Sequence, residues 1–219
     1  MWRFFSDSMV RMAEAEHQPT PRGSYAKGVA RRQEILDRAI EVFAKRGSDR
    51  TSLRAIAEEV GVTHAALKHY FGSLEELLIA VYRQSESRGE DWEPVPPDVT
   101  PTELLRRWSD ANHEVQGLVQ LYSSLVASAL EEGHPAAREF ATERFVRVRT
   151  EIAERVRHNQ RAGRIRADVD PLATAALVIA ASDGLQTQWL LDPDAPQDAA
   201  LALLDQLLSE PAPAGRPAV

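Results

Sequence analysis

Two histidines, a lysine and a tyrosine lie within seven residues in the stretch "GVTHAALKHYFGSLEELL", which runs from Gly61 to Leu78. Side chains of these types can bind a metal ion, transfer protons, or contact the phosphates and bases of a nucleic acid. His64 and His69 are five residues apart, which on a helix separates their directions by roughly 140°. Two histidines placed in this way cannot easily share one metal ion.

The rest of the sequence offers these histidines no catalytic or metal-binding partner. The chain has 219 residues and no cysteine, which excludes disulfides and zinc sites built on thiolates. Its six histidines form no HExxH pair, and no GxSxG elbow, Walker loop or GxGxxG loop is present. We therefore expect no enzymatic activity, no metal and no cofactor. An enzyme with a helical body is the rival interpretation, and it would need an acid–base or metal constellation.

Hydropathy indicates a globular protein. Hydrophobic residues make up 43% of the chain and charged residues 27%, which is ordinary for a soluble domain. No run reaches the roughly 18 apolar residues of a membrane span. The N-terminus lacks the apolar run and the small-residue cleavage site of a secretory signal. We expect a cytoplasmic protein with no membrane partner.

Charge is divided unevenly along the chain. Residues 22–71 contain ten Lys and Arg against six Asp and Glu, whereas residues 72–219 contain 14 against 24. A basic segment on an acidic remainder suits a polyanionic partner that the basic segment alone contacts. A chance fluctuation would give the same pattern, so charge by itself does not decide the function.

Helical periodicity runs through the chain, and no alternating β pattern appears, which predicts an all-α fold. The predicted organisation is a small head with three helices, including a helix-turn-helix, joined to a larger helical body. The expected parts are a flexible tail (1–24), the helix-turn-helix domain (25–72), the body (73–210, with a connecting helix at 73–88) and a disordered C-terminal tail (211–219).

Helix boundaries are marked by local capping signals. Thr51 is a natural N-cap and Gly61 a natural residue after the end of the same helix. Thr63 can cap the short helix that follows. Two later helices are expected to begin at Pro101 and Pro171, because proline is favoured in the first turn.

Residues 51–71 have the spacing of a helix-turn-helix, with a turn of about three residues between two helices. The second helix of this motif reads base edges in the major groove. Leu67 and Phe71 are expected to face the core. Tyr70, beside Phe71, is open to either a core or a contact role. The predicted DNA-binding residues are Thr51, Arg54, Thr63, His64, Ala65, Lys68, His69 and Tyr70.

The segment "IAEEVGVTHAALKHYFGSLEELL" resembles the DNA-binding segment of the TetR family of bacterial transcriptional regulators. The resemblance covers residues 28–83, and "DGLQTQWLLDP" (183–193) is similar to a segment of actinobacterial members. It implies a DNA-binding regulator, more often a repressor, that binds a palindromic operator as a homodimer and responds to a small-molecule effector. The alternative is a helical ligand-binding or interaction protein of the same fold that has lost specific DNA binding.

The sequence departs from the family pattern at two positions. Lys68 stands where members commonly carry a phosphate-contacting tyrosine, and Leu74 stands where they commonly carry a lysine. A lysine can hold a phosphate as a point charge. Our hypothesis is that Lys68 offsets the charge that is missing at Leu74.

Two predicted surfaces in the body follow from the apolar C-terminal helices and from the resemblance. A helix that is apolar around most of its circumference, as the C-terminal helices are, must pack against other helices on several faces. The resemblance to the family implies that these helices form a four-helix bundle between two subunits. The alternative is that these helices only complete the core of one subunit. The predicted interface residues are Leu177, Ala181, Leu185, Trp189, Leu201, Leu204 and Leu208.

The family also implies an effector pocket between the helices of the body. Residues with polar tips in apolar surroundings are the candidates, although a lone histidine such as His113 is more often structural. The connecting helix, which joins head to body, is the expected lever between effector and DNA. The predicted pocket residues are Trp108, Asn112, His113, Gln116, Tyr122 and Gln186.

Overall fold

The computed structural model describes residues 22–46, 53–88 and 95–209, and these contain nine helices and no strand. Thr51, the tail residues 1–21 and the C-terminal residues 211–219 lie outside the described part. The all-α prediction is confirmed. The helices are α1 (Arg22–Arg46), α2 (Leu53–Val60), α3 (His64–Phe71), α4 (Leu74–Arg88), α5 (Pro101–His113), α6 (Gln116–Ser128), α7 (Pro135–Arg161), α8 (Pro171–Leu191) and α9 (Gln197–Leu208).

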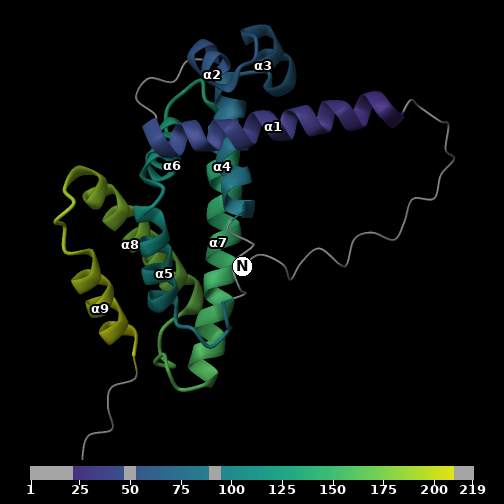
Figure 1. Cartoon of the computed structure of the whole chain (residues 1–219). Helices are drawn as coiled ribbons and strands as arrows, with labels where there is room; N and C mark the ends of the chain where they lie inside the picture. The colour runs from purple at the N-terminus through teal and green to yellow at the C-terminus, as the bar shows by residue number, and fades with distance from the viewer. Residues whose placement is uncertain (1–21, 47–52, 89–94, 210–219) are drawn as a thin grey trace, which may run out of the picture.

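The head lies across one end of the body. In Figure 1, α1 crosses α4 above α7, and α2 and α3 lie on the side of α1 away from the body. The first helix begins at Arg22, so residues 22–24 belong to α1 and not to the predicted tail. Pro21 directly precedes this start, and proline is common at the beginning of helices.

The turn between α2 and α3 has the predicted signals. Gly61 has a φ of 72°, the left-handed region that favours glycine. Thr63 accepts a hydrogen bond from the backbone N–H of Ala66 at 3.1 Å, which caps α3. Arg38 of α1 donates from Nη1 to the carbonyl of Val60 at 2.8 Å, so α1 is bound directly to the last residue of α2.

One hydrophobic core, here called the upper core, joins the head to the body. Phe43 of α1, Leu67 of α3, Leu77 of α4 and Leu121 of α6 all have no exposed surface and belong to the same cluster. Full burial of each such side chain contributes roughly 1.5–3 kcal/mol to folding. The head predicted as residues 25–72 therefore shares its interior with α4, α6 and α7.

A second cluster, here called the lower core, fills the other end of the body. It joins α5, α7, α8 and α9, and its members include Leu105, Val156, Val178 and Leu201, each at most 3% exposed. α8 starts as predicted, because Asp170 accepts from the N–H of Ala173 at 2.7 Å and Pro171 follows it. Thr102 also donates to Asp205, which ties the start of α5 to α9.

The segment before α5 is held by α7. Arg155 donates to the carbonyls of Pro96 and Val99 at 2.7 and 2.9 Å, and the buried Asn159 donates to Val99 at 3.3 Å. These bonds fix the chain where it enters the body. Among the described helices, none has the length and the apolar character needed to cross a membrane.

Candidate nucleic-acid interface and the buried polar network

The short helix α3 buries one side and leaves the others exposed. Leu67 is 0% and Phe71 is 4% exposed, and both belong to the upper core. The side chains predicted to contact DNA lie on the open faces: Thr63, His64, Ala65, Lys68 and His69 are all exposed. These residues therefore lie together on the exposed side of α3. Lys68 adds a positive charge there, and the small side chain of Ala65 permits close approach of DNA.

Tyr70 is half-buried and packs against the upper core. Its ring lies 5.5 Å from the ring of His69 in an edge-on arrangement and 6.5 Å from that of Phe71. The side chain therefore has one face on the core while its ring supports His69. The position of Tyr70 is therefore compatible with a role in the core and with a role in contacting DNA, the two alternatives that the sequence left open.

An open hollow lies between α2 and the start of α3. Arg54, Ala57, Glu58, Val62 and His64 line it, and its volume is about 620 Å³. Arg54 is exposed and places a second positive charge beside the exposed face of α3. Leu74 is half-buried against the upper core, so the residue that replaces the family's lysine serves packing.

In the body, a partly buried polar network centres on Arg144 of α7. Its Nε donates to Glu86 of α4 at 3.0 Å, and its Nη1 donates to the hydroxyl of Tyr122 of α6 at 3.1 Å. Tyr122 in turn donates to Asp183 of α8 at 3.2 Å. These four residues form what we call the Arg144 network. It links four helices, one of which is the connecting helix α4.

Aromatic rings enclose the same guanidinium. The rings of Tyr82 and Tyr122 stack with centroids 5.2 Å apart, and the Arg144 Cζ lies 4.4 Å from the centroid of Tyr122. Burial raises the pKa of Tyr122 well above its ordinary value, so the phenol stays neutral and keeps its proton for Asp183. Burial also raises the pKa of the Asp183 carboxyl, while the Arg144 charge opposes that shift.

A second pair of charges borders the network. Arg147 donates to Glu86 at 3.1 Å, so that carboxylate holds two guanidinium groups. Burial raises the pKa of Glu151, one turn further along α7, to about 7, and the charge of Arg147 partly offsets this effect. Four carboxyl and guanidinium groups thus share one partly buried region between α4 and α7.

The structure places the six predicted pocket residues in different surroundings. Tyr122 is buried in the Arg144 network, and Trp108 packs on the lower core. His113 is exposed, with its ring 4.6 Å from that of Trp189. Gln186 donates to Ser182 at 3.3 Å. Asn112 of α5 is half-buried, and Gln116 at the start of α6 is exposed. None of the six residues lines the hollow between α2 and α3.

The predicted interface residues divide into two groups. Leu201 and Leu208 are only 1% and 7% exposed, because both pack inside the lower core of one subunit, and they are therefore not available to a partner. Leu177 is 55% exposed. The others are half-buried: Ala181, Leu185, Trp189 and Leu204.

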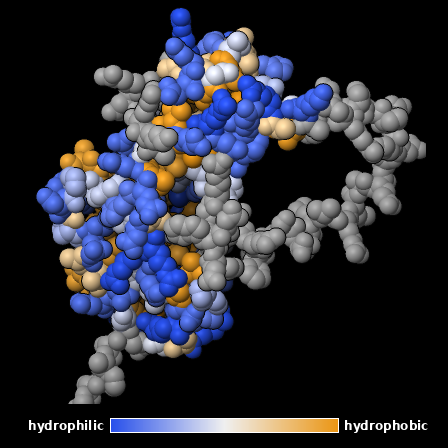
Figure 2. Space-filling view, in the orientation of Figure 1, coloured by the Kyte–Doolittle hydropathy of each residue, from blue (hydrophilic) through white to orange (hydrophobic). Residues whose placement is uncertain are grey.

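Large apolar side chains outside the predicted interface set stand exposed on α8 and α9. Leu203 and Leu207 are 56% and 60% exposed, and Leu172 is 48% exposed. Hydrophobic side chains also gather in Figure 2 on the side where α8 and α9 lie. Spacing alone does not distinguish the exposed Leu203 and Leu207 from the buried Leu201 and Leu208, because each pair lies on one face of α9.

No group of three or more His, Cys, Asp or Glu side chains that could hold a metal ion occurs in the described part of the chain. An exposed reading helix after a tight turn, on a helical body with a buried polar network, defines a helix-turn-helix regulator. Comparison with known proteins identifies the family. Residues 35–81 match the model of bacterial regulatory proteins of the TetR family, and residues 102–211 match the model of the BetI-type transcriptional repressor C-terminal domain.

The chain belongs to the TetR family, and it is a DNA-binding transcriptional regulator of the ligand-responsive repressor kind. It is 29% identical over 188 residues to the HTH-type transcriptional regulator BetI of Brucella anthropi. The aligned region covers 82% of this chain and 92% of BetI. A TetR-family structure from Streptomyces coelicolor A3 matches with a TM-score of 0.60 and 28% identity over 82% of this chain and 99% of that chain. The multidrug binding protein EbrR, complexed with proflavin, matches with a TM-score of 0.57 and 28% identity over 81% and 99%.

Proposed function

We propose that the protein is a cytoplasmic homodimer that represses transcription by binding a palindromic operator and releases it when a small molecule binds the body. The exposed side of α3 is the observation that carries this proposal. Thr63, His64, Ala65, Lys68 and His69 project from the head with no core contact of their own, while Leu67 and Phe71 anchor the helix.

Roles within α3 follow from position and chemistry. His64 and Ala65 stand in the first turn, the part of a reading helix that approaches base edges. Lys68 and Arg54 supply charge for the phosphates, which fixes orientation without reading sequence. Thr63 caps α3 and keeps an exposed hydroxyl that can also meet a phosphate. Thr51, for which the same double role was predicted, remains part of the proposal from sequence alone.

Dimerisation is proposed through the exposed side of α8 and α9. A head of this size needs a second copy to contact two half-sites roughly 34 Å apart. Leu172 and Leu177 of α8, with Leu203 and Leu207 of α9, offer apolar surface of the kind that a second copy would cover. Isologous packing places the same patch of each subunit opposite its copy.

The effector is proposed to act through α4. EbrR is a multidrug binding protein crystallised with proflavin, which supports a small-molecule role for the similar helical body of this chain. Tyr122, a predicted pocket residue, touches Arg144, and Arg144 holds Glu86 of α4. A ligand that binds beside Tyr122 with different affinity for the two arrangements of this network would shift α4 and the head that it carries.

The test is binding to the intergenic DNA upstream of the protein's own gene, measured by anisotropy against salt concentration. Neutralising phosphates releases counterions, so a specific complex should lose affinity steeply as salt rises and protect a palindromic site. Absence of any sequence preference at every salt concentration would instead favour a helical ligand-binding or interaction protein. Labels on the two heads of the dimer should change their separation on effector binding, and an unchanged separation with weakened DNA binding would contradict the lever.

A further inference from the structure

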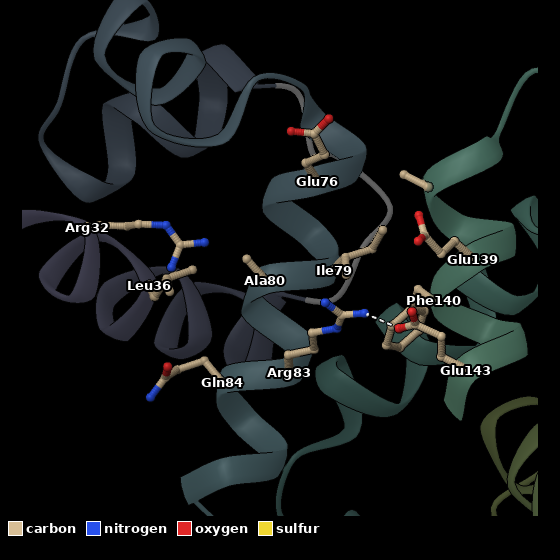
Figure 3. A pocket seen from close by; sticks show the side chains of 11 residues that line it. Arg32, Leu36, Glu76, Ile79, Ala80, Arg83, Gln84, Glu139, Phe140 and Glu143 are labelled. Carbon is tan, nitrogen blue, oxygen red and sulfur yellow. Dashed lines mark hydrogen bonds and ion pairs between the residues drawn. The ribbon is translucent and has the colours of Figure 1, made fainter. Parts of the chain in front are cut away.

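A groove crosses α4 at the junction of head and body. α4 forms its floor, and α1 and α7 form its two walls (Figure 3). Its volume is about 560 Å³, within the roughly 300–1,000 Å³ typical of small-molecule sites. None of its lining residues belongs to the Arg144 network or to the predicted DNA-binding or pocket residues.

The base of the groove is apolar. Leu36 comes from α1, Ile79 and Ala80 from α4, and Ala136 and Phe140 from α7. Leu36 and Phe140 are at most 2% exposed, so they support the groove from below, while the half-buried Ala80 and Ala136 leave room above them. Small side chains at these two positions allow the apolar part of a ligand to lie against α4.

The rim of the groove has an excess of negative charge. Two arginines, Arg32 and Arg83, face three glutamates, Glu76, Glu139 and Glu143, which gives a net charge of -1. Arg83 is already paired with Glu143 at 2.9 Å, and the Cζ of Arg32 lies 4.8 Å from the Phe71 ring centroid. The excess negative charge therefore lies with the carboxylates of Glu76 and Glu139. In Figure 3 the Glu139 carboxylate extends from α7 toward α4.

Arg83 shows how a cation fits this place. Its Cζ lies 5.7 Å from the centroid of Phe140, and its Nη2 binds Glu143, so the ring and the carboxylate hold one positive group together. Both partners of the ion pair are more than half exposed. Such a pair contributes only about 0–1 kcal/mol, so a competing cation can displace it.

We propose that this groove is a binding site for a monovalent organic cation with an apolar body. The positive group lies at Glu139, within reach of Glu143, and the apolar body lies on Ile79, Ala80 and Ala136. The site is separate from the effector site proposed around Tyr122. Its occupant lies between the α1 wall, formed by Arg32 and Leu36, and the α7 wall, so it holds the head and the body at one angle and adjusts DNA affinity independently of the body effector.

The test uses the full chain without DNA and two probes that share one apolar body, benzylammonium and benzoate. Methyl NMR of the isoleucines reports the place of binding, and calorimetry reports the dissociation constant. Glu139→Lys reverses the charge inside the groove. Glu132→Lys, at an exposed position in the turn before α7, makes the same change of charge outside it.

Benzylammonium should shift the Ile79 methyl resonance and leave that of Ile165 in the lower core unchanged. Glu139→Lys should weaken its binding by about tenfold or more, because a carboxylate–cation contact becomes a repulsion. Glu132→Lys should leave the dissociation constant unchanged. Binding of benzoate as tight as that of benzylammonium, no response of Ile79 at millimolar probe, or equal effects of the two variants would each overturn the proposal. Because no DNA is present, these outcomes do not depend on the proposed repressor function.

Discussion

Glu86, on the connecting helix α4, accepts hydrogen bonds from both Arg144 and Arg147 of α7, at 3.0 and 3.1 Å. The side chain of Arg144 is only 17% exposed, so the pair lies largely out of water. Glu86 therefore ties α4 to α7 through two guanidinium groups, in addition to the Arg83–Glu143 pair and the upper core that both helices share.

Replacement of Arg144 should destabilise the fold strongly. Arg144→Leu removes one of the two guanidinium groups that Glu86 holds and the donor to the Tyr122 hydroxyl, and it should lower the free energy of unfolding by about 3 kcal/mol. For a chain of this size that lowers the melting temperature by roughly 10 °C. Arg83→Leu, which removes an exposed ion pair, is the control and should cost about 0–1 kcal/mol. Equal shifts for both variants would show that the Arg144 network does not stabilise the body.

Lys68 and His64 should affect DNA binding in different ways. Lys68→Ala should weaken binding to all sequences and reduce the salt slope by about one, because a phosphate contact carries no sequence information. His64→Ala should instead change base preference at about 1–3 kcal/mol for one position of the operator. Anisotropy titrations on a set of single-base operator variants separate the two effects. A uniform loss for both variants would contradict the role of His64.

The exposed leucines of α9 should control the oligomeric state. Leu203→Glu and Leu207→Glu each place a charge at a position that a second copy is proposed to bury. With two such positions in an isologous interface, the dimer dissociation constant should rise by about 100-fold or more. Leu130→Glu alters a residue that is 81% exposed in the turn after α6 and should leave the dimer intact. Light scattering after size exclusion measures the masses, and a monomeric control would refute the assignment.

Glu151 should make stability depend on pH. Burial raises its pKa to about 7 from an ordinary 4.5, so the folded state holds the proton more tightly than the unfolded state. Stability from this group therefore falls as pH rises from about 4.5 to 7 and then stays constant. Glu151→Gln should gain stability relative to the parent between pH 5 and pH 8 in thermal unfolding. Glu154→Gln, at a carboxylate that is 64% exposed on the same helix, should follow the parent at both pH values.

Local signals predicted the helices well. Thr63, Thr100 and Asp170 each accept a hydrogen bond from the N–H three residues ahead, because a cap needs only its own turn. The predicted tail, residues 1–24, overlaps the start of α1 by three residues, because α1 begins at Arg22. The division between exposed and buried residues on α3 was also predictable, because Leu67 and Phe71 are large apolar residues spaced four apart, which places them on one face of the helix.

Sites built from distant residues were not predictable. Glu86, Arg144 and Asp183 are 58 and 39 residues apart along the chain, and no pattern in the sequence joins them. Tyr122 was named for its polar tip alone, and its partners appear only when α4, α6, α7 and α8 pack together. The groove over α4 is similar, because its walls come from α1 and α7. On α9, Leu201 and Leu208 look the same in composition as Leu203 and Leu207, and only packing decides which are buried.

The bond from Arg38 to the Val60 carbonyl has a consequence for genetics. It fixes the last turn of α2 to α1, so the direction of α3 depends on a helix that does not carry the predicted base contacts. A screen for altered operator choice should therefore recover substitutions along α1, Arg38 among them, beside those in α3. Such mutants would keep every DNA-facing side chain and still recognise a different spacing of half-sites.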